Sequence, residues 1–217
     1  HHMFKKLILF LFAVMSFSYV DANEANLHKA KLLFTSYFEE FKTLEAKFVQ
    51  HIFDENNIFS ESMEGSFYVE RPNKFRWHYM KPYEQIFVAD GLNFYSYDVD
   101  LEQIIIKPQE QIYDQSQVIL FLNDNRLLEY YKIEKASLEQ DIFWVTLRSI
   151  NSNQMNNEFK IGFNDGLLSQ ILLIDTIGQT ISIIFDELKT DETISSTLFT
   201  IEIPVDVDVI GQPLIID

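Results

Sequence analysis

The chain has 217 residues, of which 47% are hydrophobic and 15% aromatic, enough apolar material for the core of one domain. Its formal net charge of −16 argues against a nucleic-acid partner, because a phosphate backbone requires a basic surface, and favours a dispersed monomer. The absence of cysteine excludes a disulfide scaffold, thiol catalysis and cysteine-ligated zinc, and leaves no residue that could carry a lipoprotein's N-terminal lipid.

The N-terminus has the layout of a secretory signal peptide. Two histidines, typical of a tag remnant, precede Met3, and a basic segment follows at 4–6. Residues 7–17 are almost continuously apolar, and small residues lead to a cleavage site after Ala22. A membrane anchor is the alternative, but the apolar run is short of the roughly 20 residues that a span needs. The predicted division is a tag remnant at 1–2, a signal peptide at 3–22 and a single domain at 23–217.

Residues 24–42 predict an amphipathic helix. Apolar residues recur there every three or four positions, which places them on one stripe of a helix. The stripe must pack on another element of the protein. It consists of Leu27, Ala30, Phe34, Phe38 and Phe41.

From residue 44 onward the apolar period changes to two, as in strands with one buried face. Tight-turn signals at 90–91, 164–166 and 177–179 separate neighbouring segments. This rhythm predicts a helix followed by a long, curved antiparallel meander, with packed side chains or a ligand on its concave face. Strands are expected at 44–49, 67–70, 75–79, 85–89, 92–97, 101–107, 130–136, 141–150, 157–163, 167–175 and 180–187.

The segment at 116–122 interrupts this rhythm. It is apolar but short, so periodicity alone fits either a strand or a buried helical turn. A short helix is the favoured interpretation.

Catalytic and metal-binding patterns are weak. Outside the signal segment there are three histidines, His28, His51 and His78. No two of them have the sequence spacing of metal ligands. Asp98 and Asp100 could form an acid/base or metal pair, but their place between two strands favours a turn. The sequence also lacks a nucleophile elbow, a phosphate loop and a dinucleotide-binding fingerprint. We therefore predict a protein that is not an enzyme and needs no cofactor or metal, with a secreted carboxylate-based hydrolase as the alternative.

The most specific signal is a series of motifs spread over most of the chain. The motifs are Leu44 to Gln50, Gly65-x-Phe67-x-Val69, Arg71-Pro72-x-x-Phe75-x-Trp77, Pro82-x-x-Gln85, Asp90-Gly91, Tyr97-Asp98-x-x-Leu101-x-Gln103, and Phe199 with Pro204 to Ile210. This series resembles the LolA family of periplasmic carriers of outer-membrane lipoproteins. The chain has Asp206 where the family usually has glycine, two residues after a C-terminal proline.

The resemblance implies a mainly β fold. This is an open, incomplete antiparallel β-barrel, with an N-terminal helix and short inserted helices forming a lid over a hydrophobic cavity. It implies lipidated lipoproteins as cargo, an inner-membrane ABC-type release complex as donor and an outer-membrane receptor of the LolB type as acceptor. That receptor is itself a lipoprotein with an N-terminal cysteine, so a chain without cysteine fits the soluble periplasmic carrier. A carrier of another lipid or amphiphile on the same fold is the main alternative.

The resemblance also implies a site. In the family, the arginine that corresponds to Arg71 hydrogen-bonds the backbone of the lid in the closed, empty state, a role suited to a rigid fork of five donors. We expect the lid to contain Val118, Ile119, Phe121 and Leu122. The cavity wall and mouth are expected to contain Phe48, Phe67, Val69, Phe75, Trp77, Phe87 and Tyr95, with plain core packing as the alternative for each.

Overall fold

A computed structural model describes residues 22–112, 127–150, 158–175 and 177–216. The predicted signal peptide and the segment at 116–122 lie outside these residues, so their predicted structures remain expectations. In the described part of the chain, no helix is long and apolar enough to cross a membrane.

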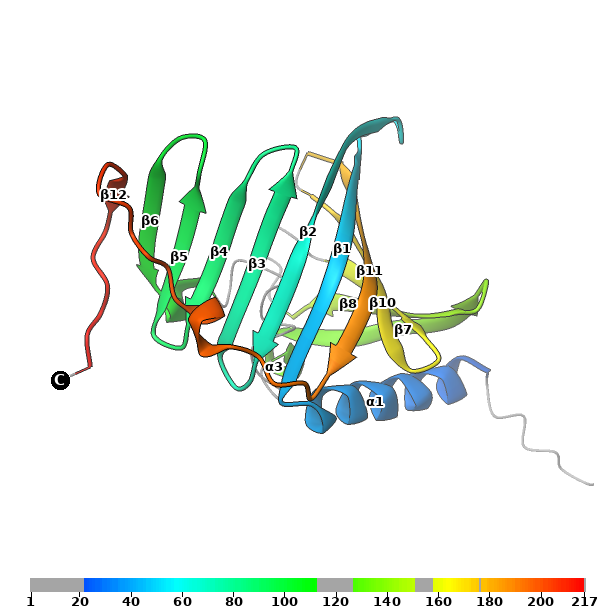
Figure 1. Ribbon diagram of the computed structural model, residues 1–217. Coiled ribbons are helices and arrows are strands. Elements are labelled where there is room, and N and C mark those ends of the chain that lie inside the picture. The colour runs from blue at the N-terminus through cyan, green and yellow to red at the C-terminus, as the bar shows by residue number, and fades with distance from the viewer. Residues whose placement is uncertain (1–21, 113–126, 151–157, 176, 217) are drawn as a thin grey trace, which may run out of the picture.

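The chain begins with helix α1 (Ala22–Glu40) and then forms two runs of strands (Figure 1). The first run is β1 (Thr43–Phe53), β2 (Phe59–Glu70), β3 (Lys74–Lys81), β4 (Gln85–Asp90), β5 (Asn93–Asp98) and β6 (Gln103–Pro108). After the short helices η1 (Gln109–Ile112) and α3 (Leu127–Tyr130), the second run is β7 (Tyr131–Glu139), β8 (Ile142–Ser149), β9 (Glu158–Asn164), β10 (Leu167–Ile174) and β11 (Thr180–Thr190). The helix η2 (Ser196–Phe199) and strand β12 (Asp208–Ile210) follow. The strands predicted from period and turns are thus confirmed, with shifted ends.

All the described strands belong to one sheet of 12 strands. Within each run, successive strands pair antiparallel, and β1 pairs with β11, which joins the two runs. The order is β12-β6-β5-β4-β3-β2-β1-β11-β10-β9-β8-β7. The outermost strands β12 and β7 do not pair with each other, so the sheet is open, as the family resemblance implied. Strand β12 pairs in parallel with β6, a contact that the predicted antiparallel meander did not include.

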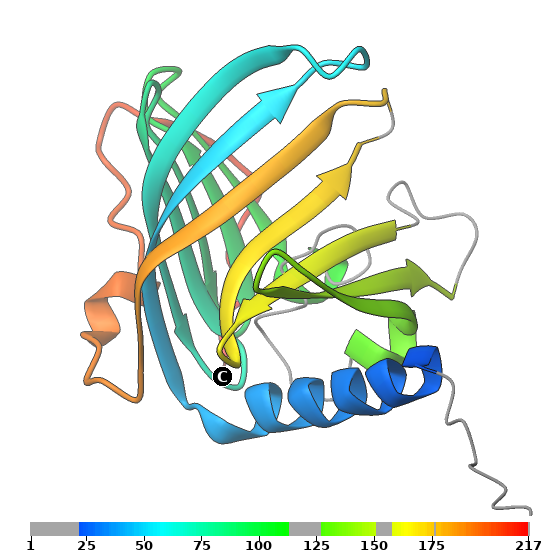
Figure 2. The ribbon, with the colours of Figure 1, turned by 90° about the vertical axis from the view of Figure 1, so that its right-hand side faces the viewer.

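The sheet curls, and α1 lies across one open end of the curl (Figure 2). We call the concave side of the sheet, which α1 covers in part, the inner face, and the convex side the outer face. The ring centroid of Phe34 lies 5.8 Å from that of Phe163 on β9, and Tyr37 lies 5.5 Å from the same ring. The helix therefore buries its apolar stripe against the second run of strands.

The predicted amphipathic helix is confirmed, but it ends at Glu40 rather than at residue 42. Ala30 and Phe34 are buried as expected, whereas Phe41 lies in the connection to β1, where it is also buried. Tyr37, which the predicted stripe did not include, is buried and packs edge-on against Phe41 at 5.2 Å.

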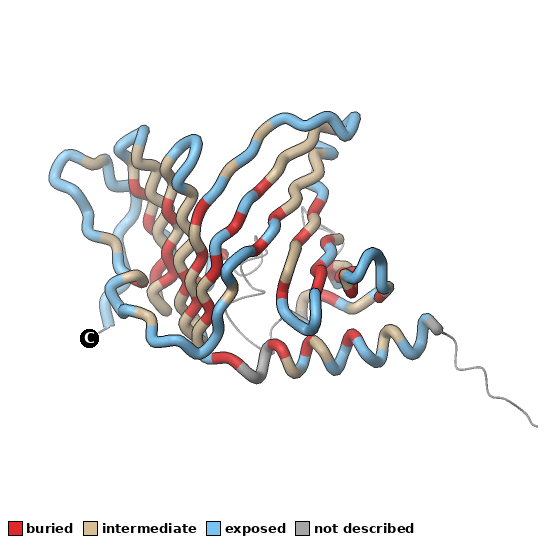
Figure 3. The backbone as a smooth tube through the Cα atoms, turned by 45° about the vertical axis from the view of Figure 1, so that its right-hand side comes forward, coloured by how far each residue is buried: buried red, intermediate tan, exposed pale blue. Residues whose placement is uncertain are grey.

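The core lies between the inner face and α1 (Figure 3). Alternate residues of β1 point to this side, and Leu44, Ala46 and Phe48 are 5% exposed or less. The same alternation continues in the paired strands because antiparallel partners point to the same face.

A second apolar layer covers the outer face of β3 to β6. The C-terminal segment crosses these strands on their convex side, where Phe199 is buried (Figures 1 and 2). The guanidinium of Arg76 on β3 donates from Nη1 to the carbonyl oxygen of Leu198 over 3.3 Å. Residues 205–206 form a turn before β12, and Asp206 has no positive φ, so this turn does not need glycine. Beneath the segment, the buried outer-face side chains are Ile86, Val88, Ile104 and Ile106.

Candidate functional site

The inner face of β1 to β4 carries a patch of aromatic rings. Phe48, Phe67 and Phe75 are each 1% exposed or less. The ring of Trp77 lies 4.3 Å from that of Phe48 and 5.0 Å from that of Phe67, measured between centroids. Val69, also fully buried, pairs with Phe75 across β2 and β3. The alternation of each strand and its antiparallel register thus bring five predicted wall residues together.

Gly65 makes room for one of these rings. It pairs with Phe48 across β1 and β2, and a Cβ atom at Gly65 would lie 2.8 Å from Cζ of Phe48. It would also collide with the carbonyl oxygen of His78. Any side chain at this position would therefore displace the Phe48 ring and the neighbouring strand.

The patch becomes more open toward β5. Trp77, Phe87 and Phe94 are only partly buried where they pack against the core. The rings of Phe87 and Phe94 are nearly parallel, at 13°, with centroids 6.0 Å apart. Phe94 was not among the predicted wall residues. Predicting it from the sequence would have required the pairing register between β5 and β4.

Tyr95 lies on the opposite side of the sheet, which corrects the expectation that it lines the cavity. It pairs with Val88 on the outer face, whereas Phe94 pairs with Ala89 on the inner face. Its neighbour Asn93, which points the same way as Tyr95, hydrogen-bonds the backbone of Leu214 in the C-terminal segment. Because side chains alternate along a strand, an error of one residue moves the predicted contact to the other face.

Arg71 lies just beyond β2, at the junction of α1 and β1. Its backbone N–H donates to the carbonyl oxygen of Lys42 over 2.8 Å. The guanidinium lies over the Phe41 ring, with 3.6 Å from Cζ to the centroid, and Nη1 donates to the Phe41 carbonyl oxygen over 3.4 Å. Burial raises the pKa of Tyr37 above its ordinary value, and the positive charge of Arg71 opposes that rise. The predicted lid residues Val118, Ile119, Phe121 and Leu122 lie outside the described residues.

Polar groups meet the aromatic patch at its end farthest from α1. The hydroxyl of Tyr79 donates to Oε1 of Gln50 over 2.8 Å, and Gln50 is only 6% exposed. Burial raises the pKa of Tyr79 to about 12, while Trp77 and Gln50 beside the hydroxyl act in the opposite direction. The tyrosine therefore stays neutral at physiological pH.

The residues considered for catalysis have structural roles instead. His78 faces outward on β3, and its Nε2 lies 2.8 Å from Oε1 of Glu84. Asp98 accepts a hydrogen bond from the backbone N–H of Leu101 over 3.0 Å, which is a turn contact. Among the residues that the structure describes, no group of three histidine or acidic side chains could hold a metal ion.

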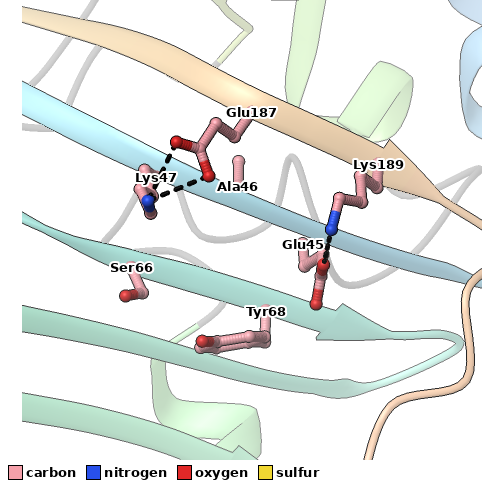
Figure 4. A pocket seen from close by; sticks show the side chains of 7 residues that line it. All are labelled: Glu45, Ala46, Lys47, Ser66, Tyr68, Glu187 and Lys189. Carbon is pink, nitrogen blue, oxygen red and sulfur yellow. Dashed lines mark hydrogen bonds and ion pairs between the residues drawn. The ribbon is translucent and has the colours of Figure 1, made fainter.

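A shallow polar depression of about 90 Å³ lies on the sheet, lined by alternate residues that point away from the aromatic patch (Figure 4). Its walls contain two exposed ion pairs, Lys47 with Glu187 at 2.9 Å and Lys189 with Glu45 at 3.1 Å. Exposed pairs of this kind are screened by solvent and contribute little. The depression is thus a solvated strand surface, separate from the aromatic patch.

The motifs and the fold agree with a known family. A family model described as "Outer membrane lipoprotein carrier protein LolA" matches residues 39–202. The chain belongs to the LolA family. Outer-membrane lipoprotein carrier proteins similar to it include one from Methylococcus capsulatus, 34% identical over 80% of this chain and 84% of that protein. Another, from Pseudomonas syringae pv. syringae, is 30% identical over 94% of this chain and 98% of that protein.

Solved structures share the LolA fold at low sequence identity. An uncharacterized conserved protein from Thermus thermophilus matches with a TM-score of 0.53 at 13% identity, over 84% of this chain and 98% of that one. A LolA superfamily protein from Nitrosomonas europaea matches with a TM-score of 0.50 at 8% identity, over 81% of this chain and 97% of that one. The open sheet with its N-terminal helix is therefore an architecture known in the LolA superfamily.

Proposed function

We propose that the inner face of this LolA-family chain binds the acyl chains of lipoproteins and carries them through the periplasm. The observation that carries the proposal is the aromatic patch, in which Trp77 and Phe87 remain partly exposed. Exposing a sixteen-carbon chain to water costs roughly 12 kcal/mol, at about 0.8 kcal/mol per methylene. A lipoprotein therefore needs an apolar cover to cross an aqueous compartment. Rigid rings can provide that cover with little loss of conformational entropy.

The proposed route starts at an inner-membrane ABC-type release complex and ends at an outer-membrane receptor of the LolB type. Its support is the family relationship and the absence of cysteine, which leaves this chain without a residue for a lipid anchor. We propose that residues 3–22 direct secretion and are removed, and that residues 23–217 act as a single carrier domain in the periplasm.

The proposed activity is carriage and not catalysis. Its support is the structural roles of His78 and Asp98 and the carrier names of the relatives. The alternative of a carrier for another amphiphile on the same fold is a distinct outcome of the experiment below.

Arg71 is proposed to stabilise the closed, empty carrier. Its guanidinium lies at the end of the inner face beside Phe41, where a fork of donors can reach backbone carbonyls of a covering segment. The proposed partner segment contains residues 118–122. Entry of acyl chains would displace that segment, and its return would favour release.

A release assay tests the carrier function. Purified residues 23–217 are added to spheroplasts that synthesise a labelled lipoprotein, and the supernatant is examined for a soluble one-to-one complex. We expect the complex with the lipidated protein and none with a form whose lipid-bearing cysteine has been replaced. Uptake of free fatty acid without release of any lipoprotein would instead identify a carrier of another amphiphile.

Two matched variants test which face of the sheet binds the acyl chains. Phe87→Ala and Tyr95→Ala each remove a half-buried ring from neighbouring strands, but on opposite faces of the sheet. We expect Phe87→Ala to reduce the yield of complex and Tyr95→Ala to leave it near the wild-type level. Equal losses in both variants would contradict the proposed face.

A further inference from the structure

The side chains of the inner face change from apolar to polar along β1 and β3, with increasing distance from α1. Toward α1 the described inward side chains of β1 and β2 are apolar, among them Leu44 and Phe67, with Arg71 just beyond the end of β2. The opposite end of the face leads to the turns after β1 and β3 (Figure 1). There the inward side chains are Gln50 and Tyr79. Trp77 lies between the two halves. An amphiphile whose chains occupy the apolar half would place its polar group near these three residues.

Trp77 has a buried hydrogen-bond donor that is not used. Its Nε1 is inaccessible to solvent and makes no hydrogen bond in the part of the chain that the structure describes. The hydroxyl of Tyr79 lies near the indole but outside hydrogen-bond geometry. A buried donor without a partner costs free energy, so its presence calls for an explanation.

Gln50 contributes a second donor. The hydroxyl of Tyr79 donates to Oε1 of Gln50, so the amide oxygen already accepts a hydrogen bond. The amide nitrogen remains available as a donor. Among the described residues, this nitrogen has no hydrogen-bond partner. The indole N–H is thus buried without an acceptor, whereas the amide NH2 of Gln50 is not fully buried and is available to donate to an acceptor on a ligand.

We propose that Trp77 and Gln50, oriented by Tyr79, form a donor site for the ester carbonyl of a fatty-acyl glyceride group. An ester has oxygen acceptors and no donor, so it matches two unpaired donors. None of the three side chains is charged, so a buried carboxylate or phosphate would find no counter-charge here to offset its desolvation, and a neutral ester is favoured. The inference rests on the proposed acyl-binding function and adds recognition of the group where the chains begin.

The test compares two uncharged probes of equal chain length. Monopalmitoylglycerol carries an ester carbonyl, and hexadecyl glycerol ether lacks it. Each competes with a fluorescent fatty acid for the full chain, and the ratio of the ether to the ester inhibition constant is the readout. We expect this ratio to be about tenfold lower in the double variant Trp77→Phe with Gln50→Leu than in the wild-type chain, since each donor contributes a modest net free energy. Trp77→Phe also shortens a ring of the aromatic patch and should weaken binding of both probes alike, so the ratio, in which this common loss cancels, is the readout and not either affinity.

One control variant separates the donor site from general damage, and two outcomes distinguish its failure from that of acyl binding. Trp144→Phe removes the N–H of the chain's other tryptophan, on the outer face of β8, and should leave the ratio unchanged. If both probes bind and the ratio is the same in wild type and double variant, the donor site is wrong while acyl binding stands. If neither probe competes with the wild-type chain, the acyl-binding function fails as well.

Discussion

At the scale of single residues, Arg71 makes three contacts with the connection between α1 and β1. Its backbone bonds the connection after α1, and its guanidinium stacks on Phe41 and donates to the Phe41 carbonyl. A cation over a ring contributes about 0.5–2 kcal/mol, depending on how far the pair is desolvated. This one side chain thus links the end of β2 to the segment that carries the helix.

Replacing Arg71 by leucine should leave the chain folded and able to take up a lipoprotein, but slow its transfer to the outer-membrane receptor at least tenfold. The physical reason is that the variant lacks the donors that stabilise the closed, empty state. Closure then no longer compensates for the free energy lost when the acyl chains leave the cavity. Transfer from the purified complex to receptor-containing membranes measures this.

Arg76→Leu is the matched control, because that arginine bonds Leu198 on the outer face and should not affect transfer. Normal transfer by Arg71→Leu, or equal impairment in the control, would refute the role of Arg71.

At the scale of elements, the C-terminal segment acts as a cover for the outer face of β3 to β6. Phe199 is 2% exposed and anchors η2 over strands whose outward side chains are themselves buried. Without this cover, apolar residues such as Val88 and Ile104 would face water. The segment therefore stabilises a region of the sheet that α1 does not reach.

Phe199→Ala should lower the free energy of unfolding by about 3 kcal/mol, because it removes a buried ring and leaves a cavity. Urea unfolding of the purified chain, followed by circular dichroism, measures the change. Val205→Ala, at a side chain that is 99% exposed, should have no measurable effect. A loss below about 1 kcal/mol for Phe199→Ala would mean that the segment contributes little to stability.

At the scale of the whole molecule, the curled sheet buries tyrosines that prefer to stay protonated. Burial raises the pKa of Tyr79 to about 12 and that of Tyr37 beyond the ordinary range, whereas tyrosines in the unfolded chain titrate near 10. Between these values the unfolded chain has lost protons that the folded chain retains. Stability contributed by these groups is therefore fully present below about pH 10 and falls as the pH rises toward 12.

We expect the free energy of unfolding of the wild-type chain to fall across this alkaline window, and Tyr79→Phe to reduce that fall by about 2 kcal/mol. Unfolding titrations at a series of pH values measure the difference in slope. Tyr83→Phe serves as the control, because Tyr83 is 69% exposed. Identical slopes in wild type and Tyr79→Phe would show that the hydroxyl is not desolvated in the folded protein.

The sequence by itself determined the elements and most of the proposed binding face. The helix stripe with Ala30 and Phe34, and the alternation through Phe48, Phe67 and Phe75, are local patterns that bury the expected side chains. Motif spacing also indicated the LolA family, because turn residues and strand residues recur in a fixed order.

Only the tertiary structure decided which of two adjacent aromatic residues in β5 faces inward. Phe94 and Tyr95 are both apolar enough for either face, so alternation gives no answer, and the pairing of β5 on β4 settles it in favour of Phe94. The parallel contact of β12 with β6 and the cover over Val88 likewise join segments about a hundred residues apart. Such contacts depend on how the sheet curls, which no local pattern encodes.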